Sequence, residues 1–340
     1  MNQNMHDKIL LAHGGGGQLS DQLIRKHILP RFANNTLSEL TDSAKLNLDS
    51  KSICFTTDSY VVKPLFFPGG DIGKLAVCGT INDLAVSGAR PVAMSLALII
   101  EEGLAFEALD KILDSIAATA AQNNVAIVTG DTKTVETGAA DQIFINIAGI
   151  GVRLNGVELG FGNIKAGDKI LINGSIGDHG MTIMSLRQDI GFKSQLKSDC
   201  AALADLTCKL LTETNGIKFM RDPTRGGLAA TLNEIALQTS FDIRINDADI
   251  PINPTVQAAA DALGFDVLNI ANEGKFVAVV APEIADDCVN ICRRHPLGQQ
   301  AAIIGEIVKT DDAPVVETIT RIGGRRIVQM PYGRELPRIC

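Results

Sequence analysis

The sequence predicts an α/β protein with two domains and a flexible C-terminal tail. The chain has 340 residues, which is enough for two hydrophobic cores. Hydrophobic residues make up 46% of it and there is no Trp, a balance that suits a soluble α/β protein. β-rich and helical segments alternate along both halves, on either side of a polar, glycine-rich connection.

The first half alternates strands and helices up to residue 153. Its clearest helix has apolar residues at threefold spacing, which form one stripe: Leu75, Cys78, Ile81 and Leu84. Pro91 follows this helix, and the apolar run after it is short enough for a buried strand. We predict these elements in order: strand 52–57, helix 73–87, strand 92–100, helix 105–122, strand 125–129 and strand 143–152.

The connection over 153–167 marks the boundary between the two domains. We therefore assign residues 1–153 to an N-terminal domain, 154–328 to a C-terminal α/β domain and 329–340 to a mobile tail. The second domain is predicted to contain these elements: strand 169–173, helices 180–188, 201–214 and 227–239, strand 242–245, helix 255–263, and strands 275–281 and 301–307.

Composition argues against several classes of protein. The net charge is 31 − 39 = −8 with no basic run, so affinity for nucleic acid or an anionic membrane is not expected. The first apolar run, 9–12, is too short for a signal-peptide core, and no run approaches a transmembrane helix. Seven cysteines without a CxxC pair indicate a reduced, cytoplasmic protein.

A run of glycines follows the first short apolar segment: His13-Gly14-Gly15-Gly16-Gly17. Four glycines let backbone N–H groups approach an anion closely, which suits contact with phosphate. The run lacks the Lys-Ser/Thr of a P-loop and the spacing of a dinucleotide fingerprint. A flexible loop is an equally good interpretation of this motif alone.

Three aspartates in the first half stand beside element ends or on a helix with a polar neighbour: Asp58, Asp83 (after Asn82) and Asp131. Mg²⁺ prefers oxygen ligands and uses one or two carboxylates together with nucleotide phosphates. The three aspartates therefore predict a site for a metal–ATP complex, with Lys133 close enough in sequence to neutralise phosphate. Each residue alone is also explained as a cap, a turn residue or a surface charge.

Two motifs in the second half suggest further contacts. In Asp222-Pro223-Thr224-Arg225-Gly226-Gly227, Asp222 suits an N-cap and Pro223 the first helical position. Capping leaves Arg-Gly-Gly unexplained, and Arg225 beside a helix N-terminus predicts an anion site. Glu273 lies just before an apolar strand, where it would serve as a general base if it faces the active cleft.

The chain ends in Cys340, on a tail whose Pro331, Gly333 and Pro337 resist helix and central strand. If extended, the ten residues from Pro331 span up to roughly 33–36 Å at ~3.3–3.6 Å per residue. A thiol on such a tether can be loaded at one place and delivered at another. A chain end without function is the alternative.

Taken together, these segments resemble the ATP-binding superfamily that includes aminoimidazole ribonucleotide synthetase, selenophosphate synthetase and thiamin-phosphate kinase. The resemblance rests on four segments in order: Thr57-Asp58, Asn82-Asp83 followed by Gly88-Ala89-Arg90-Pro91, Gly130-Asp131, and Asp222-Pro223-Thr224-Arg225-Gly226-Gly227-Leu228. Within the superfamily the chain resembles the HypE family of hydrogenase maturation proteins. The opening glycine run, Gly130-Asp131-Thr132-Lys133, Asn272-Glu273-Gly274 and the terminal Pro337-Arg338-Ile339-Cys340 carry that match, which covers nearly the whole chain.

The resemblance implies a two-domain fold like that of aminoimidazole ribonucleotide synthetase. It implies a homodimer that pairs through the sheets of the N-terminal domains, with ATP bound near the interface. Mg²⁺ would be held by Asp58, Asp83 and Asp131. The nucleotide would also contact a set of nearby residues: Gly14, Gly15, Gly16, Gly17, Asn82 and Arg225.

The resemblance also implies a reaction at the terminal thiol. A carbamoyltransferase, HypF, would load a carbamoyl group onto Cys340, and this protein would use ATP to dehydrate it to a thiocyanate. The nitrile would pass to iron held by HypC and HypD, as the cyanide ligand of a [NiFe]-hydrogenase. Lys133 would stabilise charge on the carboxamide oxygen or phosphate, and Glu273 would remove nitrogen-bound protons.

Two other classes of function compete with this interpretation. Selenophosphate synthetase would place a reactive Cys or selenocysteine in the N-terminal glycine loop, where this chain has His13 and no cysteine before Cys54. Aminoimidazole ribonucleotide synthetase would not require a mobile terminal thiol. A carrier that presents Cys340 without using ATP is disfavoured by the aspartates, Lys133 and Glu273.

Overall fold

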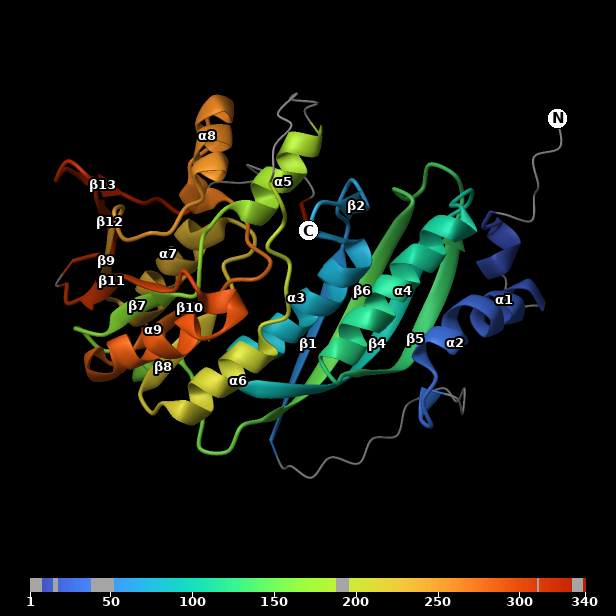
Figure 1. Ribbon diagram of the computed structural model, residues 1–340, viewed down its shortest axis with the longest axis horizontal. Helices are drawn as coiled ribbons and strands as arrows, with labels where there is room; N and C mark the ends of the chain where they lie inside the picture. Colours follow the sequence, from blue (N-terminus) through green and yellow to red (C-terminus); the bar gives the residue numbers. More distant parts are fainter. Residues whose placement is uncertain (1–7, 15–17, 38–51, 188–195, 311, 332–338) are drawn as a thin grey trace.

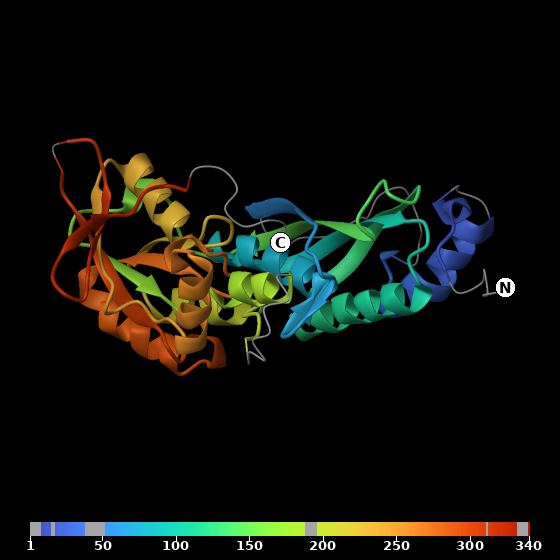
Figure 2. The ribbon, with the colours of Figure 1, turned by 90° about the horizontal axis from the view of Figure 1, so that it is seen from above.

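The fold is that of a computed structural model, which describes residues 8–14, 18–37, 52–187, 196–310, 312–331 and 339–340. Within these residues the chain forms two α/β lobes side by side, and its last residues lie between them (Figures 1 and 2). The first lobe is built on a four-stranded sheet and the second on a seven-stranded sheet. The strands are mostly antiparallel in both sheets, and each sheet contains one parallel pair.

The sheet of the first lobe has the strand order β1-β6-β4-β5. Its strands are β1 (Ile53–Tyr60), β4 (Ala89–Glu101), β5 (Ala126–Val135) and β6 (Ile143–Arg153). Two helices, α3 (Ile72–Val86) and α4 (Phe106–Gln122), cover one face of it (Figure 1). A short hairpin of β2 (Phe66–Phe67) and β3 (Gly70–Asp71) leads into α3, and the Asp71 carboxylate caps that helix by accepting from Gly73 N at 2.7 Å.

Side chains alternate between the two faces along β1 and most of β6. On β6, Ile143, Ile145 and Ile147 are buried towards the helices, because successive strand residues point to opposite faces. The opposite face exposes apolar side chains, including Phe55 (67% exposed) and Ile99 (42%). No helix of the described residues covers that face, which we call the open face (Figure 2). An exposed apolar sheet face of this kind is typical of an interaction surface.

A group of short helices packs beside β5 at the end of the first lobe. They are η2 (Leu11–Gly14), α1 (Gln18–Leu23), η3 (Ile24–Ile28) and α2 (Leu29–Phe32). Leu23 and Phe32 bury their side chains in the same core as α3 and α4. This places the first described part of the glycine run next to β5.

The second lobe has the strand order β13-β12-β9-β11-β7-β10-β8. Its strands are β7 (Lys169–Ile172), β8 (Ile217–Arg221), β9 (Asp242–Asn246), β10 (Val277–Val280), β11 (Ala302–Val308), β12 (Val316–Ile319) and β13 (Arg325–Ile327). Its helices are α5 (Asp178–Arg187), α6 (Ala204–Glu213), α7 (Gly227–Thr239), α8 (Pro254–Leu263) and α9 (Ala285–Arg293), with short turns η5 (Phe161–Asn163), η6 (Val267–Asn269), η7 (Pro282–Ile284) and η8 (Pro296–Gly298). At β10 both faces of the sheet are buried, which explains the continuous apolar run of this strand.

The structure corrects several predicted elements. β5 continues to Val135 rather than ending at 129, because the residues up to Val135 pair with β4. The strands β8, β12 and β13 were not predicted. Helix α7 begins at Gly227, and its N-cap is Gly226 with φ 76°, so the prediction that Asp222 caps it is wrong. Asp222 instead follows directly after β8.

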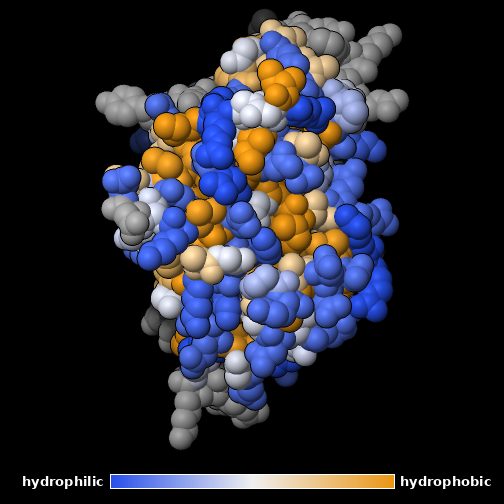
Figure 3. All heavy atoms as spheres, turned by 90° about the vertical axis from the view of Figure 1, so that its left-hand side faces the viewer, coloured by the Kyte–Doolittle hydropathy of each residue, from blue (hydrophilic) through white to orange (hydrophobic). Residues whose placement is uncertain are grey.

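The surface gives little further indication of function. The end of the molecule formed by the second sheet has apolar side chains scattered among hydrophilic ones (Figure 3), and scattered apolar residues are common on protein surfaces. Among the described residues, no helix has both the length and the apolar character needed to span a bilayer. All seven cysteines are free thiols.

Candidate active site

A pocket of about 250 Å³ opens where the two lobes meet. Asp58 on β1 and Asp83 on α3 enter it from the first lobe, while Asp222, Arg225 and Glu273 enter it from loops of the second. The complete lining is Asp58, Ser59, Tyr60, Val61, Gly79, Asp83, Arg221, Asp222, Thr224, Arg225, Glu273 and Cys340. Four carboxylates and the terminal thiol therefore share one cavity.

The first-lobe carboxylates are held by their neighbours on β1. Asp58 points to the helix-covered side of the sheet, where it accepts a hydrogen bond from Tyr60 Oη at 3.2 Å. Thr56, two residues earlier on the same face, donates its hydroxyl to Asp83 Oδ2 at 2.7 Å. The alternation of β1 thus brings a carboxylate and a hydroxyl against α3.

Asn82, the residue before Asp83, joins the two lobes. Its Nδ2 donates to the carbonyl oxygens of Ala201 (3.1 Å) and Glu273 (3.2 Å), and its Oδ1 accepts from Leu203 N at 2.8 Å. Asn82 is 1% exposed. If its side chain were removed, water could not reach these backbone groups to take over the lost hydrogen bonds. We call this three-bond contact the Asn82 clasp; it ties α3 to the loops that carry Glu273 and Ala201.

The charges in the pocket raise one another's pKa. Burial and the neighbouring Asp58 raise the pKa of Asp83, although the hydrogen bond from Thr56 opposes this. Burial, Asp83 and Asp58 raise the pKa of Asp222 to about 7. Removing carboxylates from water while keeping them together favours their protonated forms. Such a pocket is suited to a cation, which would neutralise this excess of negative charge.

Glu273 is the most strongly perturbed acid in the pocket. It is 3% exposed, and burial followed by Asp222 and Asp199 raises its pKa well above the ordinary value. Its Oε1 is buried and has no hydrogen-bond partner. Its backbone N–H is held by Asp199 Oδ1 at 3.1 Å, and Asp199 in turn pairs with Lys275 at 2.9 Å. A fixed backbone and a free carboxyl oxygen are what a proton-transferring residue needs.

The terminal Cys340 lies in the same pocket. Burial and the nearby Glu273 raise the pKa of its thiol to about 12, so the docked sulfur is protonated at neutral pH. The residue before it, Ile339, is 5% exposed and belongs to the core of the first lobe. The end of the chain is therefore seated in the pocket and not free on the surface.

The described residues contain no group of three or more His, Cys, Asp or Glu arranged to hold a metal ion by themselves. This agrees with the way Mg²⁺ is usually bound beside nucleotides, through one or two carboxylates together with phosphate oxygens and water. The oxygen donors Asp58, Asp83 and Asp222 and the orphaned Glu273 Oε1 fit a hard divalent cation that arrives with a nucleotide.

Comparisons with known proteins identify the family of this chain. Residues 40–153 match the N-terminal domain of the AIR synthase related proteins, and residues 165–316 match the C-terminal domain. The carbamoyl dehydratase HypE of Bradyrhizobium diazoefficiens is 48% identical over 331 residues, covering 97% of this chain and 95% of that protein. The chain belongs to the HypE family of carbamoyl dehydratases.

Two solved structures are similar along nearly the whole chain. The crystal structure of a HypE protein in complex with ATP has a TM-score of 0.93 at 42% identity, covering 97% of this chain and 99% of that chain. A HypE–HypF complex contains a chain with a TM-score of 0.80 at 45% identity, covering 91% of this chain and 99% of that one. The two-domain fold expected from the resemblance is confirmed.

In this HypE protein the structure brings together five of the predicted site residues, namely Asp58, Asp83, Arg225, Glu273 and Cys340. It does not bring Asp131 to them. β5 is three strands from β1, ~14 Å at ~4.7–4.9 Å per spacing. Asp131 pairs with Ala97 on the open face, whereas Asp58 faces the helices. Within one chain, the predicted metal set of Asp58, Asp83 and Asp131 is therefore not brought together.

Lys133 accompanies Asp131 on the open face and pairs with it at 3.1 Å. Both residues line a second, largely apolar cavity of about 290 Å³, which His13 also lines. Gly14 ends the short helix η2 beside that cavity, while Gly15, Gly16 and Gly17 lie outside the described residues. The predicted phosphate contacts thus divide into two groups at two places on one chain.

Two further points concern individual residues. Asn82 was predicted to contact the nucleotide; in the structure its side chain is buried and makes the three hydrogen bonds of the clasp, next to Asp83 and against the backbone of Glu273. Asp222 and Tyr60 were missed as site residues. Asp222 was interpreted as a cap because β8 was not recognised; an aspartate directly after an apolar strand was the signal that could have identified it.

Proposed function

We propose that this protein is an ATP-dependent carbamoyl dehydratase whose substrate is an S-carbamoyl group on its own Cys340, and whose product is a protein thiocyanate. The observation that supports this best is the position of the Cys340 thiol, which lies in one pocket with Glu273 and three aspartates. A carrier without catalysis would have no use for a buried base beside its cargo. The thiocyanate would then supply the cyanide ligand of a [NiFe]-hydrogenase iron.

The proposed reaction exchanges the carboxamide oxygen for a triple bond. The oxygen of S-carbamoyl-Cys340 attacks the γ-phosphorus of ATP and ADP leaves, giving a phosphorylated imidate. The Glu273 carboxylate accepts a proton from the carboxamide nitrogen. The C–O bond then breaks, phosphate leaves with the electron pair, the remaining N–H proton is lost, and C≡N forms. The sum is thiocarbamate plus ATP to thiocyanate, ADP, phosphate and a proton.

The ionisation of Glu273 depends on its surroundings. Its pKa is raised first by burial and then by Asp222 and other acids, so the pocket without ligands disfavours the charged carboxylate that accepts a proton. Mg²⁺ would be held by Asp58, Asp83 and Asp222, and there it would position the triphosphate and offset its charge. Neutralising these aspartates lowers the pKa of Glu273 towards the working range of a base. Arg225 lies on the same wall and would balance phosphate charge.

We further propose that the protein is a homodimer that pairs through the open face of the first lobe. Exposed Ile53, Phe55 and Ile99 on that face support the pairing. Asp131 and Lys133 lie on the same face, so in the dimer they would meet the nucleotide bound by the partner subunit. Mixed dimers test this: a Lys133→Ala chain combined with a Glu273→Gln chain should regain activity, whereas each variant alone should not.

The partners follow from the path of the sulfur. HypF would load the carbamoyl group onto Cys340, and the HypC–HypD complex would receive the nitrile. The solved HypE–HypF complex supports the first of these contacts.

The proposal is tested with carbamoylated protein, MgATP and intact-protein mass spectrometry. We expect ATP-dependent loss of one water from the carbamoylated chain, with one phosphate released for each nitrile. A Glu273→Gln variant should be carbamoylated normally but dehydrated slowly, whereas the exposed Glu283→Gln should match wild type. Loss of carbamoyl as a whole, without the water-loss product, would refute dehydration.

A further inference from the structure

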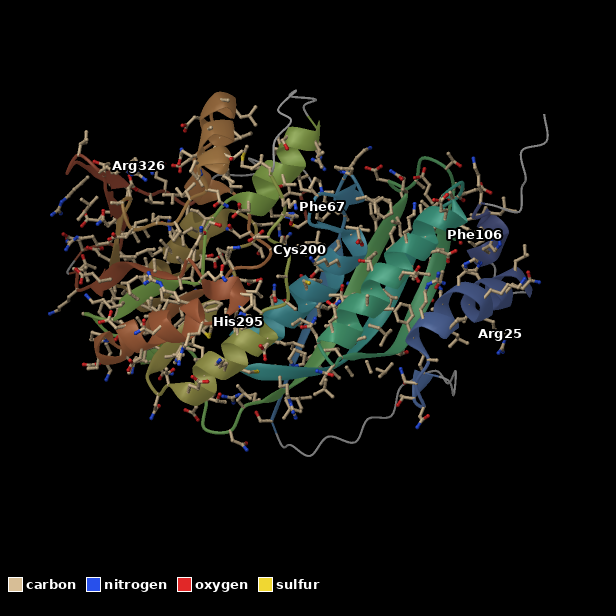
Figure 4. All side chains as sticks on the ribbon, in the orientation of Figure 1. Arg25, Phe67, Phe106, Cys200, His295 and Arg326 are labelled. Carbon is tan, nitrogen blue, oxygen red and sulfur yellow. The ribbon has the colours of Figure 1, made fainter. Side chains whose placement is uncertain are left out.

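The last two residues of the chain are held by one buried histidine. His179 Nε2 lies 2.5 Å from the carbonyl oxygen of Ile339. His179 is 0% exposed and Ile339 is 5% exposed, so this contact is closed to water. In Figure 4 the labelled Phe67 and Cys200 lie close together near the middle of the molecule, in this part of the structure. His179 is on α5 and Phe67 on β2, so both lobes contribute to this contact.

The hydrogen bonds determine which tautomer of His179 is present. A carbonyl oxygen can only accept, so Nε2 carries the hydrogen. The other ring nitrogen, Nδ1, then accepts from the Ser198 hydroxyl, 2.8 Å away. Ser198 Oγ is itself an acceptor for Cys200 N at 3.1 Å, which leaves its hydrogen directed at the ring. Two hydrogen bonds thus run in the same direction, from the Ser198 hydroxyl to His179 Nδ1 and from His179 Nε2 to the Ile339 carbonyl oxygen.

Packing holds the ring in this orientation. Phe67 meets His179 edge-on, with ring centroids 5.6 Å apart and an interplanar angle of 82°. Burial lowers the pKa of His179, which agrees with a neutral ring. The Ile339 side chain enters the same apolar cluster as Phe67, Cys78, Cys200 and Ile183. A ring that is fixed on both nitrogens and by packing is suited to hold a backbone segment in one position.

We propose that His179 is the positioning residue of the terminal tail: by donating Nε2–H to the Ile339 carbonyl, it seats Cys340 beside Glu273 for dehydration and keeps the unloaded thiol in the pocket. The part of this inference that concerns dehydration rests on the proposed function. The part that concerns the seating of Cys340 does not. Ser198 acts through His179, because its hydroxyl selects the tautomer that can donate.

The seating is measured on the full-length protein as the rate at which iodoacetamide alkylates Cys340, followed by peptide mass spectrometry. The docked thiol should react slowly, because it is partly buried in the pocket and its pKa is raised to about 12, so undocking should speed the reaction. We expect His179→Leu to accelerate alkylation about 10-fold, which corresponds to about 1.4 kcal/mol of lost docking free energy. His179→Gln should stay within about threefold of wild type, because a glutamine amide nitrogen replaces Nε2 as donor.

Three controls separate the hydrogen bond from general damage. His295→Leu is matched in chemistry but lies elsewhere in the second lobe, just after α9, where His295 contacts Asp205, and it should leave alkylation of Cys340 unchanged. Ile339→Ala alters only the tail and should accelerate alkylation even if His179→Leu folds poorly. Ser198→Ala should accelerate it less than His179→Leu, and should add little to that variant.

Two results would overturn the inference. In the first, Cys340 of a folded His179→Leu protein is alkylated at the wild-type rate, while Cys340 of the Ile339→Ala protein is alkylated faster. The other is equal acceleration by His179→Gln and His179→Leu, which would mean that ring packing, and not the donated hydrogen, seats the tail. If neither the wild type nor any variant dehydrates carbamoylated Cys340, the proposed function is wrong. The alkylation rates would still show whether His179 seats Cys340.

Discussion

Replacing Asp222 by asparagine should stabilise the ligand-free protein while it abolishes activity. The pocket keeps Asp58, Asp83, Asp222 and Glu273 together, partly or fully shielded from water. The pKa of Asp222 rises to about 7 because of burial and its acidic neighbours. An asparagine keeps the shape of the side chain and removes its charge. The increase in the free energy of unfolding measures how much the charge of Asp222 destabilises the folded protein when no ligand is bound.

The direction and size of the effect follow from linkage. A folded pKa above the unfolded one means that the folded state binds the proton more tightly, so stability is highest below pH ~4 and falls as pH rises towards 7. The shift from 3.8 to about 7 corresponds to an upper limit of roughly 4 kcal/mol at ~1.36 kcal/mol per unit. Because Asp222 is only half-buried, solvent and Arg221 screen it, and we expect about 1–2 kcal/mol.

The assay is thermal unfolding of the metal-free protein at pH 5 and pH 8. At pH 8 the Asp222→Asn protein should unfold about 2–6 °C above wild type, and the difference should shrink at pH 5. MgATP should stabilise wild type more than the variant, because it supplies the charge that the carboxylates lack. Asp312→Asn, at an exposed turn, is the matched control and should change neither curve.

One pattern would refute the reasoning about the acidic pocket. If Asp222→Asn unfolds at or below the wild-type temperature at both pH values, Asp222 is stabilised in the empty site by contacts that outweigh its burial. An increase that is the same at pH 5 and pH 8 would also contradict a titrating origin, since only an ionised Asp222 repels its neighbours.

The remaining predictions concern single side chains. Glu273→Gln should keep or slightly raise the melting temperature, because burial disfavours the charged carboxylate that the substitution removes, while the dehydration rate falls by about 10²–10⁴-fold; a large drop in melting temperature would contradict this. Asn82→Ala should cost roughly 1–3 kcal/mol in urea unfolding, since it leaves buried backbone groups of two loops without a partner, and an unchanged midpoint would disprove the clasp. Removing Cys340 should abolish nitrile formation and hydrogenase maturation in cells with no change in thermal stability; intact maturation would exclude a role for the terminal thiol.

Much of the site was accessible from the sequence because it is marked by residues with few other uses. A terminal cysteine after two prolines, an aspartate at the end of a β-rich segment and a glutamate before an apolar strand each have a structural explanation when taken alone, but their combination in one chain favours a functional one. The second-lobe helix α7 was also located correctly over Gly227–Thr239, since glycine precedes it and an apolar periodicity fills it. The catalytic and binding roles of these residues stay predictions.

The position of Asp131 was not predictable because the sequence did not determine which face of its strand the side chain lies on. In a strand a shift of one residue reverses the face, so a predicted end at 129 left the direction of Asp131 undetermined. Only the pairing of Asp131 with Ala97 assigns it to the open face. Likewise Asn82 and Asp83 differ by one helical position, and only the packed structure shows that the first is used by the other lobe while the second faces the cavity.

The Asn82 clasp has a consequence for how the pocket tolerates movement. Asp83 is covalently next to the clasping residue, and the amide of Asn82 grips the carbonyl of Glu273. If the two lobes move relative to each other, Asp83 and Glu273 should therefore move together. The distance between Asp83 and Glu273 is therefore fixed by the Asn82 clasp, however widely the rest of the cleft opens.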